Sequence, residues 1–188
     1  SHGFSATANY TWAKALDYGS NVRNSLPTDS FNLSREYGPM NQDIRQIFTG
    51  FFSYELPKFT SKFKVATPGW QLNSLVTMHT GEPLDILSGT NRSGSLNNRD
   101  RVDVVGQWDQ GVAARATSFS AVPYFNPAAF AAAATGTFGN IGRDSFYGPG
   151  FGALDFSVFK TFQILPDNRL SAQFRLEIFN LTNRDNYG

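Results

Sequence analysis

The sequence predicts an all-β fold, an antiparallel up-and-down meander of five strands. In five stretches, apolar and polar residues alternate with a period of two, which is the side-chain period of a strand. Phenylalanine is abundant, with 18 copies among 188 residues, and aromatic side chains favour strands. Residues typical of turns separate these stretches. We expect strands at about 4–13, 47–56, 70–80, 153–164 and 170–180.

The three N-terminal strands each carry one mainly apolar face. Alternation is nearly unbroken from Phe4 to Trp12. The second strand has aromatic residues at even positions, and Phe51 interrupts its polar face. The third strand begins at Trp70 and again places most apolar residues at even positions. Even-numbered residues are therefore expected to share one face of the sheet.

The two C-terminal strands form a hairpin. Both arms keep their apolar residues at even positions, and residues 166–168 supply turn chemistry between them. Pairing Ile164 with Leu170 brings the two apolar faces together. In that register Lys160 lies opposite Phe174, and it is the one charged residue on the apolar face.

The length of these arms leaves two kinds of β protein open. Each arm has about ten residues, longer than the roughly five or six of an ordinary globular strand. It matches the roughly 9 to 11 residues of a tilted strand that crosses a membrane. A soluble sandwich or a lipocalin-like barrel also alternates, with its apolar face turned inward.

The connections favour the membrane alternative. Residues 17–42 and 81–150 form long irregular connections, whereas the other two are short. Within the longer one, Asn126 followed by Pro127 predicts the start of a short helix. Alternating long and short connections are typical of outer-membrane barrels. We therefore expect a five-strand segment of a large transmembrane β-barrel, with outer loops 17–42 and 81–150.

This barrel assigns the two faces of the strands. Even-numbered residues would face lipid and odd-numbered residues the lumen. Lys160 lies near a short turn, so its long side chain could reach the membrane interface. Membrane proteins carry belts of aromatic residues at the two membrane–water interfaces. Four aromatic residues stand near strand ends, as such belts require: Tyr10, Trp12, Tyr54 and Trp70.

Composition argues against several classes of function. The net charge is +1 without a basic stripe, so we expect no nucleic-acid partner. Cysteine is absent, and neither His2 nor His79 has acidic neighbours at metal-ligand spacing, so we expect no metal and no cofactor. No nucleophile and base stand together, so we expect no enzymatic activity. The N-terminus lacks signal-peptide features, and the sequence is interpreted as part of a longer chain.

Seven segments stand out in order along the chain: NYTWAKALD at 9–17, GWQLNSLVTMHTGEPL at 69–84, NPAAF at 126–130, GTFGNIGR at 136–143, GPGF at 148–151, LDFSVFKTF at 154–162 and FRLEIFNLTNRDNYG at 174–188. Together they resemble the C-terminal β-barrel portion of Oar-like TonB-dependent receptors, outer-membrane transporters that often carry a carboxypeptidase-regulatory-like N-terminal domain. The stretch DIRQ departs from that pattern, which often has His where Gln46 stands.

The resemblance implies a location and partners. Receptors of this family have a barrel of about 22 strands closed by a plug, and they import a ligand with energy delivered through TonB. The implied location is the cell outer membrane of a Gram-negative-type bacterium. The implied partners are outer-membrane lipid, the plug domain and remaining strands of the same chain, TonB through regions absent from this sequence, and an unknown imported ligand.

Ligand contact is expected on the long outer loop. Outer loops meet the medium first, and this loop mixes aromatic residues with arginines, which suits stacking on and hydrogen bonding to a bulky polar ligand. The ligand-contact candidates are Tyr124, Arg143 and Tyr147. The alternative is that the aromatic residues only pack the loop against itself and the barrel rim.

Four polar residues are expected to face the lumen: Asp155, Arg175, Glu177 and His79. The first three share one face of the hairpin, where an acid–base pair is conceivable. Wall charges that bond to one another or to a plug are the preferred interpretation. The alternative function for the whole chain is a structural or adhesive β-domain of a secreted or cell-surface protein, with its apolar face buried against another sheet.

Overall fold

The computed structural model describes residues 3–19, 27–57, 69–96, 98–109, 124–165 and 170–186. The chain forms two compact units. One, here called the sheet unit, comprises Ser1–Thr11, Gln46–His79 and Phe151–Asn186. The other, the loop unit, comprises Trp12–Arg45, Thr80–Gly150 and Tyr187–Gly188.

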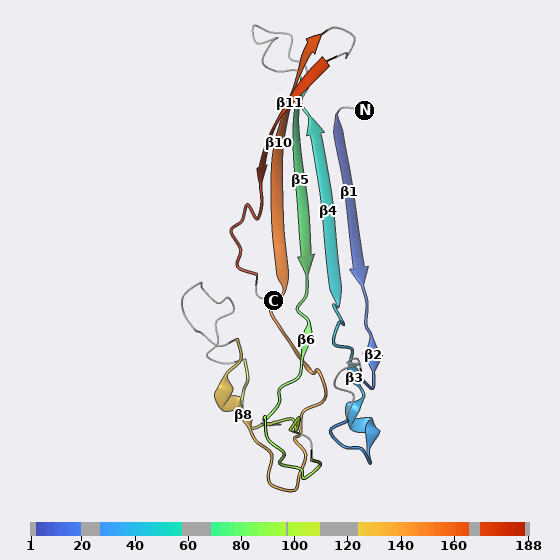
Figure 1. The fold of residues 1–188 in the computed structure, drawn as a ribbon, viewed down its shortest axis with the longest axis vertical. Coiled ribbons are helices and arrows are strands. Elements are labelled where there is room, and N and C mark those ends of the chain that lie inside the picture. Colours follow the sequence, from blue (N-terminus) through green and yellow to red (C-terminus); the bar gives the residue numbers. More distant parts are fainter. Residues whose placement is uncertain are drawn as a thin grey trace. The chain divides into compact units, whose positions relative to one another are not determined.

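The long strands form one five-stranded sheet with the order β1-β4-β5-β10-β11 (Figure 1). Their bounds are Phe4–Trp12 for β1, Gln46–Glu55 for β4, Trp70–His79 for β5, Phe151–Leu165 for β10 and Leu170–Ile178 for β11. The pairs β4–β5, β5–β10 and β10–β11 are antiparallel. The predicted all-β antiparallel meander is confirmed, and β10 begins two residues before the expected position 153.

The register brings the even-numbered residues of the central strands into continuous rows on one face. Two of these rows, given from β4 to β11, are Phe52, Ser74, Phe156 and Ile178, and Tyr54, Leu72, Val158 and Leu176. Many of these apolar side chains are partly or largely exposed. We call this the apolar face, and the face of the odd-numbered residues the polar face.

The hairpin register differs from the prediction at one point. Lys160 pairs with Phe174, as expected. Beside the turn, however, Leu170 pairs with Leu165 and not with Ile164, because the register shifts between Gln163 and Leu165. One extra residue in a strand produces such a bulge, and alternation over the rest of the strand does not reveal it. The predicted turn at 166–168 lies outside the described residues.

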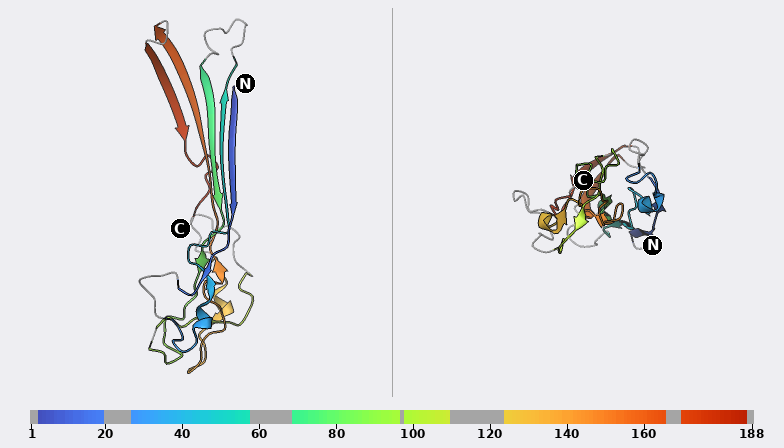
Figure 2. Two further views of the ribbon diagram at one scale, coloured as in Figure 1. Left: turned by 90° about the vertical axis from the view of Figure 1, so that its right-hand side faces the viewer. Right: turned by 90° about the horizontal axis from the view of Figure 1, so that it is seen from below.

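Past Lys160, the last residue of β10 that pairs with β5, strands β10 and β11 continue as a two-stranded ribbon (Figure 2). That Lys160 reaches the membrane interface stays a prediction. Its ammonium nitrogen lies 5.1 Å from the ring centre of Trp70 and 5.4 Å from that of Phe162. The residue is only 5% exposed. A cation over aromatic faces is attracted by their electron density.

The loop unit contains short elements around a small apolar core. Two-residue ladders join β2 to β3, β6 to β9 and β7 to β8; their bounds are Leu16–Asp17, Gly38–Pro39, Pro83–Leu84, Phe146–Tyr147, Asp103–Val104 and Phe130–Ala131. The core consists of Val102, Ile141 and Phe146, with Ile86, Val104, Phe125 and Phe130 packed against it.

Two 3₁₀ helices complete the loop unit. The predicted short helix is present at Pro127–Ala129, and the Asn126 side chain accepts the Ala128 N–H at 3.1 Å. A second helix, Leu33–Glu36, lies in the segment expected to be irregular. It is a single turn, too short to produce a helical period in the sequence.

Among the described residues, no helix combines the length and the apolar character needed to span a membrane.

Candidate functional site

Of the three ligand-contact candidates, Tyr124 is the most open to solvent, with 41% of its surface exposed. Its ring packs edge-on against Phe125, with centres 4.8 Å apart. Phe125 belongs to a cluster of edge-to-face rings whose other members are Trp108, Phe130 and Phe146. Most aromatic residues of this region therefore pack the loop against itself, and Tyr124 lies at the margin of the cluster.

Tyr147 makes hydrogen bonds within the loop unit. Its hydroxyl accepts from Nη2 and Nε of Arg45, at 2.8 and 3.1 Å, and donates to Oδ2 of Asp43 at 3.3 Å. Asp43 is almost fully buried, and its other oxygen accepts the Ala15 N–H at 2.7 Å. The hydroxyl of Tyr147 thus already serves as a partner for two charged groups.

Arg143 is only 6% exposed. Its Nη2 donates to the carbonyl oxygens of Asp17, Gly38 and Pro39, at 3.0, 3.3 and 3.1 Å, and forms an ion pair with the Asp17 carboxylate. These contacts hold the β2–β3 ladder against the segment after Ile141. Gly38 is required there, because a Cβ at this position would lie 2.5 Å from the Arg143 carbonyl oxygen.

The three candidates therefore occupy three separate sets of contacts. Arg143 and Tyr147 connect segments of the loop unit, and a ligand would have to compete with those contacts. For Tyr124, ligand contact stays a prediction that suits its exposure.

The loop unit also contains a buried charge network that the sequence analysis missed. Arg101 donates to Oε2 of Glu36 at 2.6 Å, to Oδ1 of Asp85 at 3.2 Å and to the carbonyl oxygen of Arg35 at 3.1 Å. Glu36 also accepts the Thr28 N–H at 2.9 Å. Arg101 and Glu36 are 65 residues apart, so no local motif could have indicated the pair.

Asp144 lies beside this network. It is almost fully buried, and its Oδ2 is 3.8 Å from Nη1 of Arg143. Burial, followed by the negative charge of Asp85, raises the pKa of Asp144 to about 6, although Arg143 and Arg101 act in the opposite direction. Burial also raises the pKa of Asp85, against the charge and hydrogen bond of Arg101. Asp144 thus holds its proton to a higher pH than an ordinary aspartate does.

The four residues expected to face the lumen lie at odd positions of the sheet, on the polar face. Arg175 pairs with Phe159, and its guanidinium lies 4.8 Å from that ring centre while Nε donates to Gln173 at 2.6 Å. The ring of His79 stacks on Phe151, with centres 5.1 Å apart and planes 7° from parallel. Among the described residues, neither Asp155 nor Glu177 forms an ion pair.

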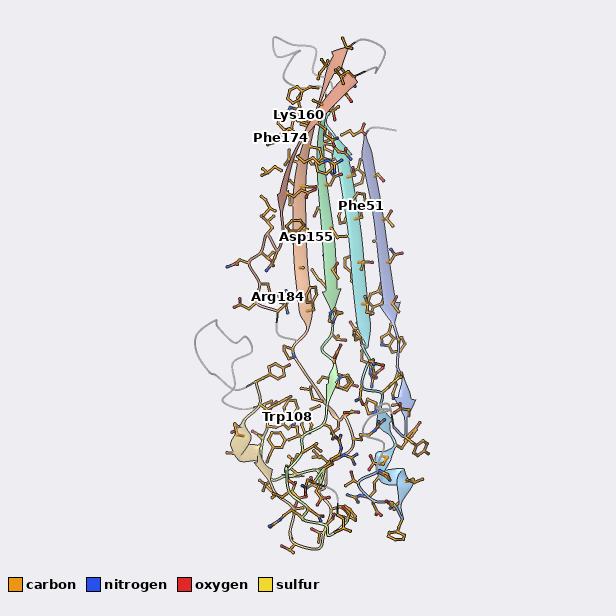
Figure 3. The ribbon with its side chains drawn as sticks, in the orientation of Figure 1. Phe51, Trp108, Asp155, Lys160, Phe174 and Arg184 are labelled. Carbon is orange, nitrogen blue, oxygen red and sulfur yellow. The ribbon has the colours of Figure 1, made fainter. Side chains whose placement is uncertain are left out.

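A polar row crosses the middle of this face. It consists of Ser53, Asn73, Ser157 and Glu177, one residue from each of β4, β5, β10 and β11. The next row contains Phe51, Leu75 and Asp155. Figure 3 shows Phe51 about midway along β4 and Asp155 nearer the start of β10.

Most residues of these two rows line a shallow hollow of about 160 Å³. Its lining includes Phe51, Leu75, Asn73, Asp155, Ser157, Glu177 and Phe179. The sequence analysis found Asp155 and Glu177 but missed Asn73, because a single asparagine in a strand becomes notable only when the register shows its neighbours. Among the described residues, no group of three or more His, Cys, Asp or Glu side chains is arranged to hold a metal ion.

A family model described as "Outer membrane beta barrel domain" matches residues 1–188. No curated protein and no solved structure matches the chain.

Proposed function

The chain belongs to the outer membrane beta barrel domain family, and from that premise we propose that it is part of an Oar-like TonB-dependent receptor that imports a ligand. A domain of this family lies in the outer membrane of a Gram-negative bacterium. The proposed partners are outer-membrane lipid, a plug domain and further strands of the same chain, TonB and an imported solute. We assign the chain no catalytic role.

The observation that carries the proposal is the distribution of side chains over the two faces of the sheet. Apolar side chains of successive strands form rows on one face and are largely exposed, for example Phe174 and Leu176. The buried residues of the polar face include Ser53 and Asn73. Lipid on the apolar face and a polar lumen on the other would account for both features.

The resemblance of seven ordered segments to Oar-like receptors supports the narrower assignment to TonB-dependent import. The loop unit supports a receptor in particular. It has its own apolar core, and a folded outer loop can present fixed side chains such as Tyr124 to the medium.

The orientation of the faces can be tested in the intact protein. Single cysteines at Val158 and Phe174, on the apolar face, would carry fluorescent labels, and cysteines at Ser157 and Gln173 would serve as controls on the polar face. A lipid-soluble quencher should quench the first pair more strongly. Stronger quenching at Ser157 and Gln173 would overturn the assignment of faces.

Import can be tested without knowing the ligand. Cells with and without the gene would be grown in a defined mixture of solutes, and depletion of each solute would be followed by mass spectrometry. At least one solute should be taken up only when both this protein and TonB are present. Uptake that survives disruption of TonB, or identical depletion with and without the gene, would contradict the proposal.

A further inference from the structure

We propose that an exposed row of side chains on the loop unit binds anionic lipid at the outer surface of the membrane. The row, here called the lipid row, consists of Trp12, Lys14, Leu16, Tyr18 and Tyr37. The inference rests on the proposed function in taking the even-numbered face of β1 as the lipid face. It goes beyond that function by extending lipid contact into the loop unit and by giving the contact a charge.

The chain stays extended from β1 into β2, so the alternation of the strand continues. The N–H groups of Ala13 and Ala15 donate to partners within residues 43–45, at 3.0 and 2.7 Å, and Asp17 pairs in the β2–β3 ladder. Every second residue thus bonds to the same neighbouring segment, which is the pattern of an antiparallel strand. The even-numbered side chains between them therefore share the face of the even-numbered residues of β1.

The two faces of this extended segment have different surroundings. On the odd-numbered face, Asp17 forms an ion pair with Arg143. Gly38, the ladder partner of Asp17, lies so close to Arg143 that a Cβ would be 2.5 Å from its carbonyl oxygen. On the even-numbered face, Trp12 is 75% exposed and Tyr18 is 60% exposed. The loop unit therefore packs against one face and leaves the aromatic face open.

Tyr37 widens the open face. It is 53% exposed, and its ring centre lies 5.0 Å from that of Tyr18. Leu16, in the ladder beside this pair, is also exposed. Single exposed apolar residues are ordinary, whereas a contiguous set marks an interaction surface.

Continuity with β1 identifies the occupant of this surface as lipid. Tyr10 and Trp12 lie at the end of β1 that is expected at the outer membrane interface. An extended chain spans at most about 3.6 Å per residue, so Lys14 lies within about 7 Å of Trp12. The headgroup layer on each side of a bilayer is roughly 5 to 8 Å thick. Lys14 therefore falls within the headgroup layer.

The charge of Lys14 favours an anionic headgroup. Lys14 is exposed and forms no ion pair with a described residue. The acidic residues nearest to it in the sequence and across the ladder, Asp17 and Asp43, pair with Arg143 and Arg45. A lysine flanked by aromatic and aliphatic side chains suits a phosphate headgroup together with the start of its acyl chain.

The depth of the lipid row tests the contact. The intact purified protein in lipid nanodiscs would carry a fluorescent label on a single cysteine, Leu16→Cys or Tyr18→Cys. Val105→Cys and Leu96→Cys are the controls, because both positions are exposed elsewhere in the loop unit. A nitroxide on the lipid headgroup should quench the first two labels more strongly than the controls. Equal quenching at all four positions, or none at Leu16 and Tyr18, would overturn the proposal.

Lipid preference tests the charge. Quenching of the label at Leu16→Cys by nitroxide-bearing phosphatidylglycerol, which is anionic, would be compared with quenching by nitroxide-bearing phosphatidylcholine, which is zwitterionic. The ratio should favour phosphatidylglycerol about fivefold, as expected for one lysine near an anionic surface. Lys14→Gln should abolish this preference. Arg99→Gln, which removes a cation of the loop unit outside the lipid row, should leave it unchanged. A preference that survives Lys14→Gln, or that Arg99→Gln abolishes equally, would overturn the proposal.

Failure of this inference can be told apart from failure of the proposed function. If labels at Val158 and Phe174 are quenched from the lipid while the label at Leu16 is not, the lipid face of the sheet stands and the lipid row is wrong. Neither measurement involves uptake or TonB, so energy-dependent import is confirmed or contradicted separately.

Discussion

The sheet unit and the loop unit differ in the side chains that they bury. All buried hydrophobic residues among those described lie in the loop unit: Val102, Ala129, Ala133, Ile141 and Phe146. The buried polar or charged residues of the sheet unit are Ser53, Asn73 and Lys160. The loop unit therefore has an apolar core beside its buried charges, whereas the sheet unit leaves its large apolar side chains exposed, as expected where lipid covers them.

This difference shows that the surroundings, and not the residue types alone, determine which side chains are covered. The loop unit also encloses charges, and some of them are paired, as Arg101 is with Glu36 and Asp85. In the sheet unit, exposure of phenylalanine and leucine needs no second protein layer, because lipid can cover them.

The largest effect is expected from the core of the loop unit. Phe146→Ala removes a buried ring that contacts Trp108, Phe125 and Phe130, and should lower the free energy of unfolding of this unit by about 3 to 5 kcal/mol. Hydrogen exchange measured by mass spectrometry should rise in the loop unit and stay unchanged in β4, β5 and β10. Phe31→Ala is the control, because that side chain is fully exposed. Equal rises in the sheet would show that the two units are not independent.

A charge on the apolar face should have the next largest effect. Val158→Arg places a cation among Leu72 and Leu176, and should destabilise the protein in vesicles by about 2 to 4 kcal/mol if this row lies near the membrane midplane. Ser157→Arg, one residue away on the polar face, should cost much less. Urea titration of the heat-modifiable form on gels measures both. The apolar face would not be the lipid face if the two variants were equally stable.

A smaller effect is expected from the hydroxyl of Tyr147. Tyr147→Phe removes one acceptor for Arg45 and one donor to the buried Asp43, and should cost about 1 to 2 kcal/mol within the loop unit. Limited proteolysis of the intact protein would report the loss. Tyr124→Phe is the matched control, because no hydrogen bond of its hydroxyl is found among the described residues. If proteolysis of the Tyr147 variant were unchanged, the hydroxyl would not contribute to stability, and it could instead contact a ligand.

The smallest effect concerns Asp144 and pH. Its pKa in the folded protein is raised from 3.8 to about 6, so the unfolded chain holds the proton less firmly than the folded one. The resulting stabilisation is complete below about pH 4 and is lost as the pH rises through 6. Asp144→Asn should therefore stabilise the loop unit by about 1 kcal/mol at pH 7.5, after allowance for solvent screening, and by almost nothing below pH 4.

Proteolysis rates measured with a protease active over this pH range would follow the effect. Asp109→Asn, at an exposed position, should show no such dependence on pH. A gain that is equal at both ends of the range would mean that the substitution acts through something other than the charge of Asp144.

The strands could be predicted from the sequence because alternation is a local property. The parity of Val158 and Ser157 assigns each to a face without knowledge of any partner. The bulge beside Ile164 could not be predicted in this way, since it depends on how the hairpin closes. The short helix after Asn126 was predictable, because the capping asparagine and the proline are adjacent in the sequence.

Much less of the candidate site was predictable. Arg143 and Tyr124 are both plausible ligand contacts by residue type, and only their burial and partners distinguish them. Asn73 and Glu177 meet through Ser157, which is far from Asn73 in sequence, so the hollow depends on register. Contacts of this kind are non-local, and the amino-acid composition does not predict them.

The contact between Arg143 and Asp17 has a consequence for the order of assembly. The two residues are 126 positions apart, and strands β4 and β5 lie between them in the chain. Contacts that close such long stretches form late, because the entropy lost on closing the stretch is paid before the contact is made. The β2–β3 ladder is therefore fully stabilised only after the segment around Arg143 has packed against it. Residues near Asp17 should accordingly become protected against a protease late in biogenesis. The time at which this protection appears would show when this part of the chain has finished folding.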